Sequence, residues 1–264
     1  MSQQQIDSLI SELAKQSMPY ECFEQEFSKI EEFELIDFDL DNVRLLGLNV
    51  CLNSKNEICL KSKSTKIKDE SFCVVDIEST GSIKNGQIIE IGAVRIQNGK
   101  EIAKFESLVR ASEVPDNISE LTGISTAMLE NAPHLPSVLN EFRLFLKDSI
   151  FVAHNVGFDY GFISASLNKC GFGVLLNQRL CTINLARRLL PSARYSLSTL
   201  KELLGIQSTH HRALADARAA AQIMLHCFSK LPFYIKNTQD LLNFSKSSLK
   251  ERKKKGEGVL KEGE

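Results

Sequence analysis

The apolar positions of the first 50 residues recur with the spacing of amphipathic helices. Ile6, Leu9, Ile10 and Leu13, for example, share one face of a predicted helix. The pattern predicts helices over residues 6–16, 20–30 and 39–49, followed by a strand or small hairpin over 57–67. We therefore expect a small, mainly helical domain over residues 1–68, either winged-helix-like or a generic helical appendage.

The pattern changes after a polar linker at residues 61–71. An Asn98-Gly99 pair inside an apolar stretch is a strong hairpin signal. Strands are predicted over 72–78, on both sides of that turn within 87–109, and over 149–155, and helices over 137–148, 158–171, 196–205 and 212–231. This order favours an α/β fold with a mixed sheet flanked by helices. We expect this domain to span residues 69–231 and residues 232–264 to form a partly disordered tail.

Composition and charge narrow the class of protein. The chain is 43% hydrophobic and 25% charged, which is typical of a globular protein. It has no membrane-length apolar run, and the sequence pattern predicts no signal peptide. Seven scattered cysteines favour reduced thiols, so we expect a cytoplasmic protein without a membrane partner.

The net charge of −1 is unevenly distributed. Residues 1–70 carry 8 Lys and Arg against 14 Asp and Glu, and residues 71–229 carry 15 against 14. Residues 230–264 carry 9 against 5, including the run KERKKKG at 250–256. Because there is no large basic footprint, the chain is not a typical free-standing nucleic-acid binder. The acidic N-terminal segment favours contact with a protein.

The stretch DIESTG places two acids on one face of a predicted strand. Asp76 and Glu78 are two residues apart, about 6.6 Å along the strand. Two carboxylates on an apolar strand need cationic partners, unless the end of the strand is exposed. Thr80 and Gly81 then suggest a tight turn where the backbone can approach a ligand.

Two later stretches place acids at the starts of helices. In AHNVGFD, Asp159 enters the first turn of a helix behind His154 and Asn155, which can anchor the turn through hydrogen bonds. In STHHRALAD, Asp216 follows two histidines at the start of the last long helix. Each stretch alone is more typical of ordinary helix-start chemistry than of catalysis.

The four acids and a histidine together favour a different interpretation. Residues at strand ends and helix starts can converge at one edge of a sheet, where four carboxylates would repel one another without counter-charge. Two divalent cations held by these carboxylates could supply the counter-charge and bind a phosphoryl group between them. A histidine could then accept a proton from the attacking water.

The ordered set Asp-x-Glu-x-Thr-Gly, His-Asn-x-x-Phe-Asp and His-x-x-x-x-Asp resembles the DEDDh family of 3′→5′ exonucleases. GQIIEIGAVRI (86–96) and LTGISTAMLENAP (121–133) are similar to the proofreading epsilon (DnaQ-type) subunit of bacterial DNA polymerase III and to PolC-type exonuclease domains. The resemblance spans about residues 71–229. It implies an RNase H-like fold, two Mg²⁺ or Mn²⁺ ions, and release of nucleoside 5′-monophosphates from a 3′ end.

The resemblance also implies roles for individual residues. Asp76, Glu78 and Asp216 would ligate the catalytic metal. Asp76 would also bridge to a second ion, which Asp159 would bind directly or through water. The family spacing between histidine and the last aspartate selects His211, rather than His210, as general base. The residues implied to bind the terminal nucleotide, or placed beside it, are Thr80, Gly81, Asn155 and Phe158, although Phe158 is also typical of a core position.

The leading hypothesis is a proofreading 3′→5′ DNA exonuclease that works with the DNA polymerase III catalytic subunit on single-stranded or frayed 3′ ends. Mispaired ends cost least to unpair, which favours their removal. The alternatives are an RNA 3′-end trimming enzyme similar to RNase T or oligoribonuclease, a DNA-repair exonuclease, and an inactive nuclease fold in a transcriptional or scaffold protein. The additional N-terminal 70 residues, absent from a minimal epsilon subunit, keep the repair alternative open.

One short motif lies outside this region. Gln239, Leu242 and Phe244 are spaced as in peptides that bind bacterial sliding clamps, although an ordinary amphipathic turn has the same pattern. The basic segment 246–264 that follows is expected to be disordered.

Overall fold

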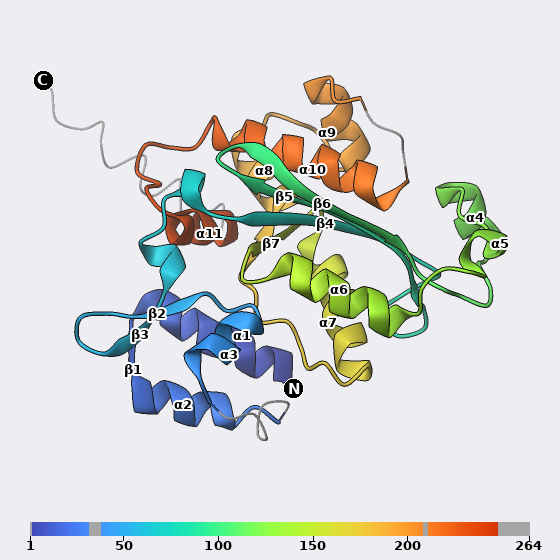
Figure 1. Cartoon of the computed structure of the whole chain (residues 1–264). Helices are drawn as coiled ribbons and strands as arrows, with labels where there is room; N and C mark the ends of the chain where they lie inside the picture. Colours follow the sequence, from blue (N-terminus) through green and yellow to red (C-terminus); the bar gives the residue numbers. More distant parts are fainter. Residues whose placement is uncertain (1, 32–37, 208–210, 248–264) are drawn as a thin grey trace, which may run out of the picture.

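The computed structural model describes residues 2–31, 38–207 and 211–247. It shows an α/β region built on a five-stranded sheet and a smaller N-terminal region, drawn in blue in Figure 1. None of the helices in these ranges is long and apolar enough to cross a membrane.

The central sheet has the strand order β6-β5-β4-β7-β8. Its strands are β4 (Phe72–Ser79), β5 (Ile88–Gln97), β6 (Lys100–Leu108), β7 (Ile150–Ala153) and β8 (Arg179–Cys181). β4 pairs antiparallel with β5 and parallel with β7, so the sheet is mixed, as the sequence predicts. The β5–β6 turn has positive φ at both Asn98 (52°) and Gly99 (71°), the geometry expected of an Asn-Gly hairpin.

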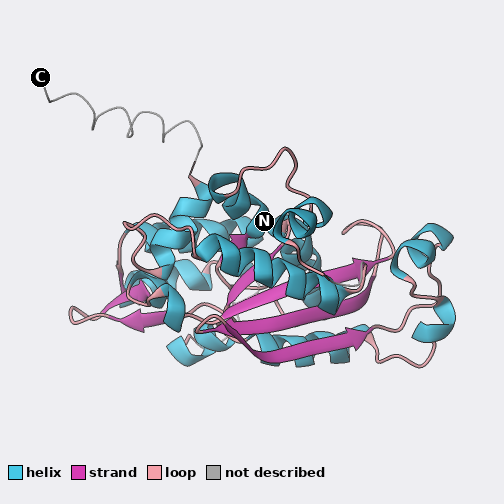
Figure 2. Cartoon of the chain, turned by 90° about the horizontal axis from the view of Figure 1, so that it is seen from above, coloured by secondary structure: helices cyan, strands magenta, loops and turns pink. Residues whose placement is uncertain are grey.

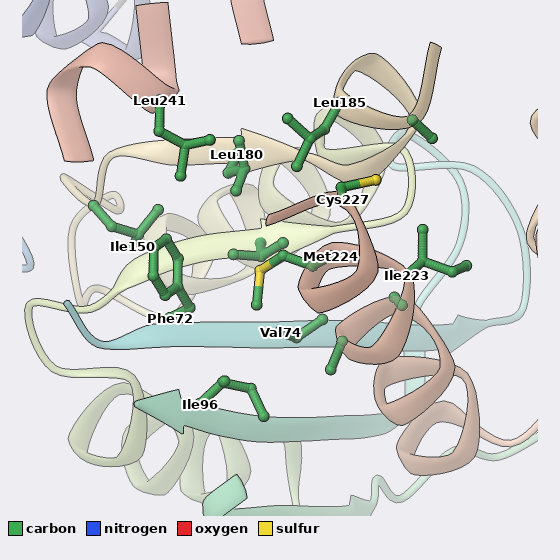
Figure 3. Close-up of a cluster of buried hydrophobic side chains, with 14 of the residues drawn as sticks. Phe72, Val74, Ile96, Ile150, Leu180, Leu185, Ile223, Met224, Cys227 and Leu241 are labelled. Atoms are coloured by element: carbon green, nitrogen blue, oxygen red, sulfur yellow. The ribbon is translucent and has the colours of Figure 1, made fainter. Parts of the chain in front are cut away.

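Helices cover both faces of this sheet, because each central strand is apolar on both sides. Phe72 and Val74 of β4 face a cluster that includes α10, whereas Cys73 and Val75 face one that includes α6 and α7. Figure 3 shows the first cluster between the sheet and α10. The helices of this region are α4 (Asp116–Thr122), α5 (Thr126–Leu129), α6 (Leu135–Leu146), α7 (Val156–Lys169), α8 (Thr182–Leu189), α9 (Leu197–Leu204), α10 (Ala213–Phe228) and α11 (Thr238–Lys246).

The N-terminal region has the connectivity of a winged-helix module. Its elements are α1 (Ser2–Lys15), β1 (Met18–Pro19), α2 (Tyr20–Ser28), α3 (Leu40–Leu45), β2 (Val50–Leu52) and β3 (Glu57–Leu60). The strands form an antiparallel sheet of order β1-β3-β2, separate from the large sheet (Figure 2). The sequence pattern predicts the helices but only one strand or hairpin, because β1 and β2 are two and three residues long.

The N-terminal module packs against the segment that leads into β8. Val174 and Leu176 are buried in the module's own apolar cluster, and Asp7 pairs with Arg179 at 2.5 Å. Between the two regions, residues 61–69 form two short 3-10 helices, η2 (Lys61–Lys63) and η3 (Ile67–Asp69), rather than an extended linker.

The expected boundary at residue 231 and the clamp-binding interpretation are both corrected by α11. Leu242 and Phe244 are 1% and 5% exposed and belong to the core cluster of the sheet. Gln239 is 6% exposed, and its side-chain oxygen accepts hydrogen bonds from Ser62 and Gln178. Because the clamp-like side chains hold α11 in the core, they are not available to a sliding clamp.

Candidate active site

The carboxylates of Asp76 and Glu78 lie near the carboxyl end of β4, on its α10 face. The alternation that turns Phe72 and Val74 toward α10 turns these two acids the same way. Both are half-buried. A register shift after Glu78 then ends the regular pairing with β5.

The first turn of α10 reaches this edge because β5 leaves room for it. Gly92 pairs with Asp76 across the strands, and a Cβ at Gly92 would lie 2.0 Å from the backbone nitrogen of Leu214. Only a residue without a side chain permits this approach. It carries Asp216, in the same helical turn, to β4. One oxygen each from Asp76, Glu78 and Asp216 lies within 4.8 Å of the others.

A buried acid on β5 holds the first turn of α10 in place. Glu90 is fully buried on β5, directly opposite Glu78, and accepts a bidentate pair of hydrogen bonds from Arg212. Glu90 also accepts the backbone N–H of Ala213 at 2.9 Å. Glu90 therefore fixes the two residues at which α10 begins.

Two groups hold the carboxylate of Asp216. Its Oδ2 accepts the backbone N–H of His211 at 3.0 Å, and its Oδ1 lies 3.5 Å from the ammonium of Lys201, which is 3% exposed. His211 has a left-handed backbone (φ 55°) and is exposed to solvent, beside the site. His210 lies outside the described residues.

Asp159 enters from α7 and is 4% exposed. It is outside the group of three carboxylates, but its charge contributes to the high pKa of Asp76. Asn155 precedes the helix in a left-handed conformation (φ 84°), and the Phe158 ring packs edge-on against Phe162 at 5.8 Å. Asn155 and Phe158 are both exposed.

Burial and mutual repulsion make these acids hold protons unusually well. The pKa of Asp76 is raised well above its usual value by burial and then by the charge of Asp159. Burial raises the pKa of Glu78 to about 7, with Glu90 and Asp216 adding to the effect and Arg212 opposing it. Burial also raises the pKa of Asp159 to about 7, against backbone hydrogen bonds from Asp159 itself and Ile77. A cation at this site would stabilise the ionised carboxylates and so oppose these shifts.

His154 and Thr80 hold the loops around the site. The Nε2 of His154 faces the carbonyl of Tyr195 at 3.0 Å, and Nδ1 lies 2.8 Å from the Thr182 hydroxyl. Burial lowers the pKa of His154, which fits a neutral structural histidine. The Thr80 hydroxyl accepts the N–H of Gln87, which closes the loop that begins at the exposed Gly81.

The donor set fits a hard divalent cation. Asp76 and Glu78 are half-buried and Asp216 is buried, with one oxygen of each within 4.8 Å of the others. Carboxylate oxygens of this kind are the ligands that Mg²⁺ and Mn²⁺ prefer. The ammonium of Lys201, beside Asp216, supplies one positive charge against these three carboxylates.

Sequence reasoning overlooked four residues that build this site: Glu90, Gly92, Lys201 and Arg212. A signal exists for the first two, because a charge and a glycine within the apolar strand IIEIGAV need a reason. Lys201 and Arg212 show no comparable signal, since their roles depend on contacts made by the folded chain.

This chain is similar to known nucleases and polymerases. The sequence profile of the exonuclease family RNase T matches residues 73–224. The PolC-type DNA polymerase III of Thermotoga maritima is 40% identical over 186 residues, which cover 69% of this chain and 14% of that protein. A Mycobacterium tuberculosis protein, whose name gives it both exonuclease and endonuclease parts, is 38% identical over 196 residues, covering 65% of this chain and 30% of that protein.

A solved structure shares the architecture. Exonuclease X, in complex with 5′ overhanging duplex DNA, superposes with a TM-score of 0.51 at 25% identity, covering 66% of this chain and 99% of that one. The chain spans less than a third of the length of the two curated relatives above. The profile match covers more than half of the chain and includes Asp76, Glu78, Asp159 and Asp216. The chain therefore belongs to the RNase T exonuclease family, in its DEDDh group near the PolC and DnaQ exonucleases.

Proposed function

We propose that this protein is a metal-dependent 3′→5′ DNA exonuclease that removes nucleoside 5′-monophosphates from frayed 3′ ends, as the proofreading subunit of a DNA polymerase III. The observation that carries the proposal is the convergence of Asp76, Glu78 and Asp216 within 4.8 Å, with His211 bonded to Asp216 through its backbone.

The residues divide the chemistry between them. Asp76, Glu78 and Asp216 would hold one Mg²⁺ or Mn²⁺ ion, and Asp76 with Asp159 a second. Such ions, when bound, neutralise the phosphate and lower the pKa of water. His211 accepts a proton from the attacking water. The water oxygen bonds to phosphorus as the P–O3′ bond breaks. The leaving 3′ oxygen takes a proton from solvent.

The rim of the site suits a strand end. Thr80 and Gly81 follow β4, Asn155 precedes α7 and Phe158 lies in its first turn. We assign these four residues contacts with the terminal nucleotide. A site entered by single strands favours mispaired ends, because these cost least to unpair. The similarity to polymerase-linked exonucleases supports a polymerase partner, and the DNA in the Exonuclease X complex supports DNA as substrate.

The test is a timed digestion by the full chain of paired DNA, mispaired DNA and RNA ends of the same sequence, with Mg²⁺ or Mn²⁺. We expect mononucleotide release, fastest from mispaired DNA and abolished by chelation. Faster digestion of RNA would replace this proposal with 3′-end trimming of RNA.

Variants connect that activity to the site. Asp76→Asn and His211→Ala should each lower kcat by about a hundredfold or more. Asp116→Asn, an exposed acid in the first turn of α4, and His210→Ala should not. An Asp76→Asn protein of full activity would refute the assignment of the site.

A further inference from the structure

A pocket of about 520 Å³ opens at the end of the sheet opposite the acids. It lies where β4 begins and where β5 and α10 end, whereas the active site lies at the other ends of these elements. Most of its lining is apolar and includes Ile67, Phe72, Ile96, Leu225, Phe228 and Ile235. Figure 3 shows Phe72 and Ile96 on neighbouring strands at this end of the cluster. From Asp216 to Phe228, α10 rises by about 18 Å, so the pocket is well separated from the acids.

Two aromatic side chains stand exposed beside the pocket. Phe233, which lines it, is 86% exposed, and Tyr234 is 52% exposed, with their rings edge-to-face at 5.9 Å. They lie in the segment between α10 and α11, which Figure 1 shows near the β5–β6 turn. An exposed apolar patch of this kind, next to a pocket, is typical of a binding surface.

Three exposed lysines lie at or near the rim of the pocket. Lys68 lines the pocket, the Lys236 ammonium lies 5.9 Å from the Phe233 ring, and Lys230 precedes the aromatic segment. All three lysines are exposed, and within the described residues none takes part in an ion pair. Three acids lie nearby: Asp69 is exposed, and Glu70 is 6% exposed and accepts the N–H of Ser71. The carboxylate of the third, Asp240, accepts the backbone N–H groups of Lys236 and Asn237.

We propose that this pocket docks a short peptide segment of a partner protein, with a Phe or large aliphatic side chain in the pocket and acidic residues against the lysines. Its volume is in the range of ligand pockets, about 300–1,000 Å³. Its mainly aliphatic and aromatic lining accepts an apolar side chain, whereas a nucleobase would leave most of its polar edge unpaired. A partner bound here leaves the acidic site open to a DNA end.

The test uses the full chain and a fluorescein-labelled peptide with one Phe and one Leu among Asp and Glu residues. Fluorescence anisotropy should show binding that weakens with salt and is lost when the Phe and Leu of the peptide become Ser. Phe233→Ser and Lys236→Glu should each weaken binding by about tenfold or more.

Matched variants control for exposure and charge elsewhere. Leu144→Ser, at a site 62% exposed on α6, and Lys169→Glu, at an exposed site ending α7, should leave peptide affinity unchanged. Phe233→Ser should also leave the melting temperature and the rate of nucleotide release unchanged.

Three outcomes would overturn the proposal. One is peptide binding that is absent, or insensitive to both Phe233→Ser and Lys236→Glu. The second is binding of a labelled oligothymidylate, but not the peptide, that Phe233→Ser abolishes, since the occupant would then be a single-stranded nucleic acid. The third is self-association in light scattering that Phe233→Ser abolishes, which would make the patch an interface between copies of this chain.

Discussion

At the scale of single residues, the acids of the site hold protons at higher pH than ordinary carboxyl groups do. The pKa values of Glu78 and Asp159 are raised to about 7, chiefly by burial. The folded chain therefore holds protons on these groups at pH values where the unfolded chain has lost them. Between the ordinary pKa of a carboxyl and pH 7, these groups make the metal-free protein less stable as pH rises.

In the function proposed above, divalent cations bind the ionised carboxylates, so they should reverse this trend. We expect Mg²⁺ or Mn²⁺ to raise Tm more at about pH 8 than at about pH 6, since at the lower pH protons must first be displaced. Differential scanning fluorimetry over a metal titration at each pH measures the effect. Asp159→Asn removes one of the titrating groups and should reduce the difference. Equal shifts in Tm at both pH values would contradict the raised pKa values.

The Glu90–Arg212 pair should affect activity indirectly, because it positions the first turn of α10 and does not itself react. Glu90→Gln removes the charge that binds Arg212 and weakens the anchor at Ala213, so it should cost about 1–3 kcal/mol of unfolding free energy. Because the first turn of α10 carries Asp216, kcat should also fall by about tenfold or more.

The matched control for Glu90 is Glu101→Gln. Glu101 also binds an arginine, Arg218, through two hydrogen bonds, but both side chains are partly exposed, at 35% and 42%. Its loss should cost about 0–1 kcal/mol and leave kcat unchanged. Urea unfolding and single-turnover kinetics separate the two variants, and equal behaviour would show that Glu90 has no special role.

At the scale of elements, the site depends on how closely α10 can approach β5. In Gly92→Ala, the new Cβ would lie 2.0 Å from the backbone nitrogen of Leu214, so the helix start must move away from the sheet. Such overpacking costs about 1–3 kcal/mol. A displacement of Asp216 by about 1 Å should lower kcat by about a hundredfold.

Gly157→Ala provides the comparison for that variant. Gly157 is also close to a site acid, in the first turn of α7, but nothing lies within 4 Å of a Cβ built there. Its unfolding free energy should change by less than about 0.5 kcal/mol, with kcat retained. Activity and chemical denaturation measure both variants, and full activity in Gly92→Ala would refute this account of how Asp216 is positioned.

The elements also show where sequence reasoning works and where it stops. Long periodic segments, such as those that form α10 and β5, were predictable because each repeats one pattern over ten or more residues. β8 has only three residues and carries no such pattern. The pattern in α11 is ambiguous, because the spacing of Leu242 and Phe244 is the same in a clamp peptide and in a buried amphipathic helix, and the structure shows the second. The Asn237–Asp240 capping box that starts α11 was an available signal.

The site divides in the same way. Asp76, Glu78, Asp159 and Asp216 could be selected from the sequence because a resemblance to one family orders them. Glu90 and Lys201 could not be given roles, because these depend on strand register and on contacts with residues 122 and 15 positions away. The choice between His210 and His211 rests on spacing alone.

At the scale of the whole molecule, the N-terminal module and the exonuclease region form one packed unit. Leu176, 1% exposed, lies in the module's cluster although it belongs to the exonuclease region by sequence. Arg179 pairs with Asp7 while its guanidinium lies 4.5 Å from the centroid of the Tyr160 ring. A Cβ at Gly47 would lie 2.2 Å from the Asn177 side chain, so the surfaces are in close contact. Unfolding of one region should therefore expose apolar surface of the other.

Leu176→Ala should consequently destabilise both regions together. Truncation of a buried leucine to alanine costs about 2–5 kcal/mol of unfolding free energy. The amides that lose protection from exchange are those of the part of the chain that unfolds together. We expect faster exchange in the core helices α1 and α10 alike, measured by native-state hydrogen exchange with mass spectrometry. The control Leu121→Ala, at a site 51% exposed on α4, should change neither. Faster exchange in α1 alone would show that the module unfolds independently. Unfolding of the acidic N-terminal module would then leave the chemistry of the exonuclease region unaffected. Faster exchange in both helices would instead mean that a partner that stabilises the module also stabilises the active site.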